Sequence, residues 1–128
     1  MSKMDDAVVF SKKYDFDFPQ ALTKPVIETL MTRLIQDIGR PLSHKGIILG
    51  HIKMVAKLPD TEFVFLSLTR LDQVDIKLSA QWARELTSTW KTIHLDINVL
   101  LFGQRTEVLE EVVAGSLAIL RRDSSCQE

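Results

Sequence analysis

The chain has 128 residues, of which 45% are hydrophobic and 26% charged, and its formal net charge at pH 7 is −1. This length suffices for one domain with its own hydrophobic core, and the composition excludes disordered, collagen-like and coiled-coil proteins. The small net charge and a pI near 6.3 give the whole chain no electrostatic attraction to nucleic acid or to an anionic membrane.

Cysteine use and the chain ends indicate the compartment. The single cysteine, Cys126, excludes a disulfide within the chain, which is typical of a reducing compartment. Residues 1–6 lack the pattern of a signal peptide, and no apolar run approaches the roughly 20 residues of a membrane helix. We therefore expect a cytoplasmic protein with no membrane partner. A single globular domain should span residues 1–122, followed by a flexible tail over residues 123–128 that carries Cys126.

In chain order, the first element is an alternating segment that ends before Pro19. Aromatic residues at 14, 16 and 18 alternate with charged residues at 13, 15 and 17, and this period of two predicts a strand or an extended arm. A helix follows over residues 24–39. Thr23 can cap it, Pro25 fits its first turn, and apolar residues recur on one stripe. We expect Gly39 to end this helix, with Pro41 just beyond.

The most apolar part of the chain, residues 46–70, predicts a β-hairpin. Two apolar runs flank Pro59 and Asp60, which favour a tight turn. In the first strand, alternate residues from Ile48 to Leu58 share one face, and those from Ile47 to Lys57 share the other. Neither strand has a clean polar side, so we expect both faces to be at least partly covered, by helices on each side or by helices and another subunit.

The remaining chain alternates weakly over residues 71–78, which could form a short strand. Ser79 is expected to cap a short helix over about residues 80–90, with Trp82 and Trp90 on one side. Residues 92–102 predict a strand, and residues 107–121 predict a helix capped by Thr106. The fold class is therefore α+β, a two-layer sandwich. It combines a mainly antiparallel sheet of three to four strands with two main helices (24–39 and 107–121) and a short helix (80–90).

The most site-like feature is a polar stripe in the strand at residues 92–102. His94 and Asp96 project from the same side of the strand, so a carboxylate could orient an imidazole for general base catalysis. His51 and Lys53 form a second pair in the hairpin. If the two strands are neighbours in a suitable register, the four side chains could converge on one site. Alternatively, the stripe is an ordinary sheet surface that faces solvent or another subunit.

The sequence gives weaker signals for a metal site, a cofactor site or a nucleic-acid site. The histidines lack the compact spacing of a metal motif, so we expect no metal site. The glycines never cluster into a phosphate-binding loop, and we expect no cofactor. A modestly basic region from Arg33 to Lys57 contains no aromatic residue on which bases could stack, which argues against nucleic acid as a partner.

These patterns favour a small cytoplasmic binding or assembly domain that is homo-oligomeric through its sheet face or edge. The alternative is a small enzyme that uses His94, Asp96, His51 and Lys53 as acid–base residues. A second alternative is a nucleic-acid-binding module. A small-molecule ligand is compatible with any of these functions, and the sequence leaves open whether the protein is an enzyme.

Overall fold

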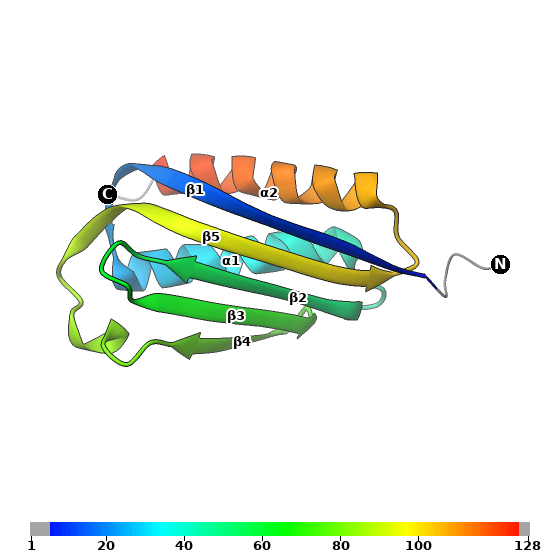
Figure 1. Cartoon of the computed structure of the whole chain (residues 1–128), viewed down its shortest axis with the longest axis horizontal. Helices are drawn as coiled ribbons and strands as arrows, with labels where there is room; N and C mark the ends of the chain where they lie inside the picture. The colour runs from blue at the N-terminus through cyan, green and yellow to red at the C-terminus, as the bar shows by residue number, and fades with distance from the viewer. Residues whose placement is uncertain (1–5, 126–128) are drawn as a thin grey trace.

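The computed structural model describes residues 6–125 and shows an α+β fold with one five-stranded antiparallel sheet and two helices (Figure 1). The strand order in the sheet is β1-β5-β2-β3-β4. The elements in chain order are β1 (Ala7–Thr23), α1 (Lys24–Leu42), β2 (Ile47–Lys57), β3 (Phe63–Arg70), β4 (Gln73–Leu78), the 3-10 turn η2 (Trp82–Arg84), β5 (Thr89–Phe102) and α2 (Thr106–Ser125). The α+β class and the antiparallel sheet are confirmed, but the sheet has more strands than the predicted three to four.

The alternating first segment forms β1, which among residues 6–125 pairs only with β5 and so is an edge strand. It does not end before Pro19 but continues to Thr23, with a register break between Asp17 and Leu22. Proline is tolerated there because an edge strand has one side on which no N–H is needed for the ladder. Phe16 and Phe18 are buried beneath the sheet, as the alternation indicates.

Helix α1 begins as predicted, with Pro25 in its first turn, but it extends to Leu42 and includes Pro41. Gly39 is therefore not a helix terminator. A Cβ atom at Gly39 would lie 2.4 Å from Cδ2 of Leu68 in β3. The glycine allows the last turns of α1 to approach the sheet closely, which explains why it occupies a helical position despite its low helix propensity.

The predicted hairpin is confirmed as β2 and β3. In its turn, the Oδ1 atom of Asp60 accepts a hydrogen bond from the Glu62 N–H at 2.9 Å, and Thr61 takes a positive φ of 75°. The weak alternation at residues 71–78 forms β4 at the second edge of the sheet. Because β5 inserts between β1 and β2, the strands that carry the predicted site residues are direct neighbours.

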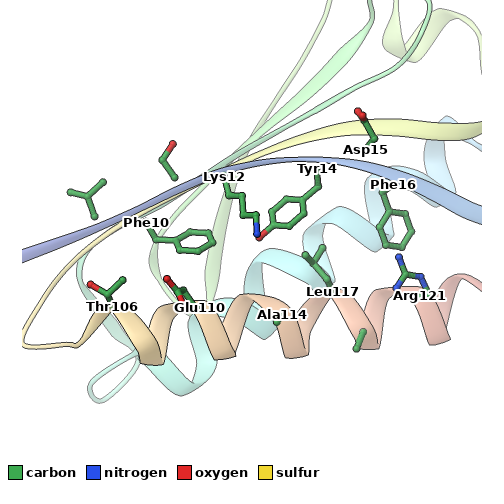
Figure 2. A pocket seen from close by; sticks show the side chains of 13 residues that line it. Phe10, Lys12, Tyr14, Asp15, Phe16, Thr106, Glu110, Ala114, Leu117 and Arg121 are labelled. Atoms are coloured by element: carbon green, nitrogen blue, oxygen red, sulfur yellow. The ribbon is translucent and has the colours of Figure 1, made fainter.

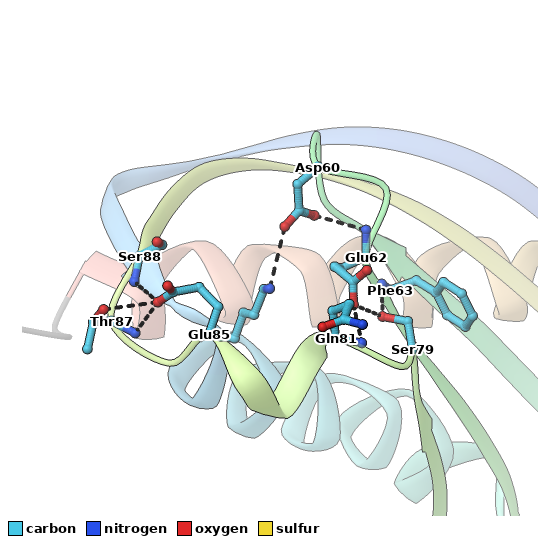
Figure 3. A network of polar contacts seen from close by, with 9 residues as sticks. Asp60, Glu62, Phe63, Ser79, Gln81, Glu85, Thr87 and Ser88 are labelled. Atoms are coloured by element: carbon cyan, nitrogen blue, oxygen red, sulfur yellow. Dashed lines mark hydrogen bonds and ion pairs between the residues drawn. The ribbon is translucent and has the colours of Figure 1, made fainter.

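The short helix predicted over residues 80–90 is wrong. In this segment the chain forms one 3-10 turn, η2, and Trp90 belongs to β5. Side-chain hydrogen bonds to the backbone compete with helix formation here (Figure 3). Ser79, the expected cap, accepts the Phe63 N–H and donates to Glu62 instead, and Glu85 accepts hydrogen bonds from the Thr87 and Ser88 N–H groups.

The Glu85 carboxylate makes this loop sensitive to acid. Hydrogen bonds from the Ser88 and Thr87 backbone N–H groups lower the pKa of Glu85 from 4.5 to about 2. Since the folded-state pKa is depressed, the contribution of these bonds is complete above pH 4.5 and is lost as the pH falls toward 2. We expect the protection of the Thr87 and Ser88 amides, taken as the exchange rate relative to the intrinsic rate at each pH, to fall over this pH range. NMR hydrogen exchange would measure this. A Glu85→Gln variant should lose the pH dependence, and an unchanged profile in that variant would contradict the assignment.

Both helices pack against the same face of the sheet, where the core lies (Figure 1). Helix α2 extends to Ser125, and Ser124 is buried, so residues 123–125 of the expected tail are helical. Cys126 lies outside the described residues. No helix among the described residues has the length and apolar character needed to cross a membrane. No helix of the described part of the chain covers the opposite face of the sheet, and this surface is called the open face below.

Candidate functional site

The open face is built by the period-two alternation of β1, β5, β2 and β3. Alternate residues beginning at Phe10, Ile93, Ile52 and Val64 point to the helices and are mostly buried. Their neighbours in sequence point the other way. The strand registers align these outward side chains in rows across the sheet, so the open face includes Val9, Ser11, Lys13, Asp15, Leu49, His51, Lys53, Val55, Lys57, Phe63, Phe65, Ser67, His94, Asp96, Asn98, Leu100 and Phe102.

One end of the open face holds a charged cluster, which consists of Lys13, Asp15, Lys57, His94 and Asp96. His94 lies opposite both Asp15 and Lys57 in the strand ladder, and its Nδ1 atom contacts Oδ1 of Asp15. The Lys57 Nζ atom lies 3.6 Å from Oδ2 of Asp96. Together these side chains line a shallow depression of about 440 Å³. The cluster therefore contains two separate side-chain pairs, His94 with Asp15 and Lys57 with Asp96.

The four predicted site residues all lie on the open face, but they do not form one cluster. His94 and Asp96 are in the charged cluster, where each has a different partner. Lys53 lies opposite Asn98. His51 lies opposite Leu100, six positions along β5 from His94, which corresponds to roughly 20 Å in an extended strand.

Sequence reasoning missed Asp15 and Lys57 as neighbours of His94. The alternation in the first segment placed Asp15 on a polar side, and Lys57 was placed on the same hairpin face as His51. The missing information was the pairing of β1 with β5 and the register of β2 against β5. No local pattern in the sequence encodes these long-range pairings.

The charged cluster is open to solvent, which limits the chemistry that it can support. The side chains of His94 and Asp15 are 60% and 83% exposed. Water therefore screens the charges of this cluster. Electrostatic stabilisation of a transition state is strong only in a site that excludes water, and no element of residues 6–125 shields the cluster from solvent. Among residues 6–125, no group of three or more His, Cys, Asp or Glu side chains is arranged to hold a metal ion. The cluster suits reversible polar contacts better than acid–base catalysis.

The other end of the open face is apolar. The apolar end consists of Val9, Leu49, Leu100 and Phe102. The exposed fractions are 63% for Val9, 41% for Leu49 and 40% for Phe102. Leu100 lies between Val9 and His51 in the ladder. The Nδ1 atom of His51 is buried at this end with no hydrogen-bond partner among the described residues.

The modestly basic region seen in the sequence does not form one surface. Arg33 and Arg40 belong to α1, which lies behind the sheet, whereas Lys53 and Lys57 project from the open face. Arg40 also makes an ion pair with Asp37 at 3.1 Å. The sheet thus separates these positive charges, and they cannot follow one phosphate backbone together.

A scan against protein-family models and searches of curated proteins and of solved structures found no match to this chain.

Proposed function

We propose that this protein is a small cytoplasmic binding and assembly domain that associates with a second copy of itself through the open face. The observation that carries this proposal is the apolar end, where several large side chains are exposed side by side. Monomeric proteins rarely expose contiguous apolar surface of this kind unless it binds something. Burial of these side chains against a second copy would remove them from water, which is the main driving force of most protein association.

The charges on the open face fit a two-fold contact between identical surfaces. In an isologous contact each patch must complement itself, so a surface with equal numbers of both charges is suited to it. The strand registers bring both signs to this face. The lysines are Lys13, Lys53, Lys57 and Lys77, and the aspartates are Asp15, Asp17, Asp75 and Asp96. This balance also favours a protein partner over a nucleic acid.

Sedimentation velocity at micromolar protein concentrations tests the proposal. The wild-type chain should sediment as a dimer or a larger oligomer. A Leu49→Lys and Phe102→Lys double variant should dissociate, because it places two charges where each copy buries apolar surface. We expect its dimer dissociation constant to rise at least about 100-fold, which corresponds to the loss of two buried apolar side chains.

The matched control is Ile76→Lys. Ile76 is also a strand residue that is 37% exposed, but it lies opposite Leu66 and so points to the helix side of the sheet. This variant should associate like the wild type. A wild-type monomer across the concentration series would refute the proposal, as would equal loss of association in the control and the double variant.

A further inference from the structure

A hollow of about 730 Å³ lies between the edge strand β1 and helix α2, on the helix side of the sheet (Figure 2). Phe10, Lys12, Tyr14 and Phe16 point from β1 toward α2 and form one wall. Helix α2 forms the other wall, which is lined by Thr106, Glu110, Ala114, Leu117, Ala118 and Arg121. None of these residues belongs to the apolar end or to the charged cluster of the open face.

The outer backbone edge of β1 borders this hollow. Val9, Ser11 and Asp15 line it, although their side chains belong to the open face. Figure 2 shows the Asp15 side chain pointing away from the hollow, so this residue reaches it through the main chain. Among the described residues β1 pairs only with β5, and its outer N–H and C=O groups therefore have no strand partner. A backbone in extended conformation can pair with these groups in register, as an added strand does.

The α2 wall of the hollow is the surface on which an added strand could rest, and it is called the floor below. Figure 1 shows α2 reaching past the outer edge of β1, where no described strand covers it. The residues that it presents to the hollow include the small side chains of Ala114 and Ala118, both exposed, and the partly buried Leu117. Small residues at this floor leave space for large apolar side chains from every second residue of an added strand.

The charges in the hollow favour an acidic occupant. The Lys12 Nζ atom lies 5.4 Å from the centre of the Tyr14 ring, and the Arg121 Cζ atom lies 5.1 Å from that of Phe16. Neither cation has a carboxylate partner among residues 6–125. Glu110 is the one carboxylate side chain on the α2 wall, and burial and this carboxylate raise the pKa of Tyr14. Two cations against one carboxylate leave the hollow with an excess of positive charge.

We propose that this hollow is a strand-addition site for an extended segment of another protein, in which large apolar residues alternate and at least one inward residue is acidic. The added segment would extend the sheet beyond β1, with its apolar side chains on Ala114 and Ala118 and a carboxylate near Lys12 or near Arg121. The stretch from Phe10 to Phe16 allows pairing over about 20 Å. This site is independent of the proposed self-association, because the two surfaces share no side chain that either one needs.

Selection of random peptides of about ten residues displayed on phage, against the full-length chain, tests the proposal directly. Enriched peptides should show apolar residues at every second position and an acidic residue among them. N-methylation of single backbone amides in a synthetic copy of the best peptide should weaken binding about tenfold at alternate positions only. This periodic loss is the signature of strand pairing. No enrichment, or binding that is insensitive to N-methylation, would overturn the proposal.

Variants on α2 separate this site from other surfaces. Ala114→Trp fills the floor and should abolish peptide binding, whereas Glu111→Trp alters an exposed α2 residue outside the hollow and should leave it intact. Arg121→Glu should shift the selected peptides from acidic to basic. If Ala114→Trp reduces self-association in sedimentation and no peptide is enriched, the occupant is a second copy and this proposal is wrong. Loss of self-association in the Leu49→Lys and Phe102→Lys double variant, with peptide binding retained, would support separate sites on the open face and in the hollow.

Discussion

Replacing Gly50 with alanine is expected to lower the free energy of unfolding by about 4 kcal/mol, because the new side chain would collide with the neighbouring strand. Gly50 has a φ of 140°, which L-residues with a side chain rarely adopt. A Cβ atom there would lie 1.9 Å from the carbonyl oxygen of Leu100 and 2.8 Å from its carbonyl carbon. These are backbone atoms of the interior strand β5, so no side-chain rotation can relieve the clash.

Gly115→Ala is the matched control for this prediction. Gly115 lies inside α2, and a Cβ atom there would meet no atom within 4 Å. Alanine should raise stability at this position by roughly 0.5–1 kcal/mol, since glycine carries an entropic cost in a helix. Urea denaturation followed by tryptophan fluorescence would measure both variants. If Gly50→Ala costs less than the gain from Gly115→Ala, the close contact between β2 and β5 at this position is not as described.

The second large effect concerns Lys24, whose side chain is almost fully buried at the start of α1. Its Nζ atom lies 3.4 Å from Oδ2 of Asp60 in the hairpin turn, 5.7 Å from the Trp82 ring centre and 5.9 Å from that of Trp90. This lysine therefore joins α1, the β2–β3 turn and the loop before β5 through one charge. We expect Lys24→Ala to destabilise the protein by about 3 kcal/mol, because it removes a buried ion-pair partner and two cation–π contacts.

Lys12→Ala provides the comparison, because Lys12 also lies over an aromatic ring, that of Tyr14, but is exposed. Its loss should cost less than about 1 kcal/mol. A double-mutant cycle with Asp60→Ala should give a coupling of roughly 1–3 kcal/mol between Lys24 and Asp60. Thermal unfolding of the four proteins would measure it. A coupling near zero, or equal losses for Lys24→Ala and Lys12→Ala, would contradict the role assigned to this buried charge.

Much of the fold could be predicted because each main element carries a clear period. The alternation around Tyr14, Met54 and Ile97 predicted which side chains share a strand face, and the 3.6-residue stripe from Ile27 to Ile38 predicted α1. The failures lie where tertiary contacts override local rules. Gly39 resembles a helix terminator in sequence, but it serves close packing against Leu68. Residues 80–90 carry a weak helical pattern. The Glu62 carboxylate accepts hydrogen bonds from the Ser79 hydroxyl and the Gln81 N–H, and the Glu85 carboxylate accepts one from the Thr87 N–H, so these groups do not start or extend a helix.

For the candidate site, the sequence could predict only which side of its strand each residue lies on. The sequence places His94 and Asp96 on one side of a strand, and they do share the open face. It could not show that Asp15, from the beginning of the chain, is the neighbour of His94, because the register between β1 and β5 depends on the whole fold. The hollow beside α2 could not be predicted from the sequence either, because it forms between β1 and α2, which are far apart in the chain.

The position of β5 in the sheet has a consequence for how the protein is made. The β2–β3–β4 meander pairs neighbours in sequence, so it can form early, but β1 has no partner until β5 leaves the ribosome. Until then, β1 and the free edge of β2 both lack their shared neighbour, and the nascent chain presents unpaired strand edges to other chains. Closure of a sheet through such distant segments is slow compared with local pairing. A chaperone that holds the nascent chain would therefore be most useful just before residues 89–102 emerge.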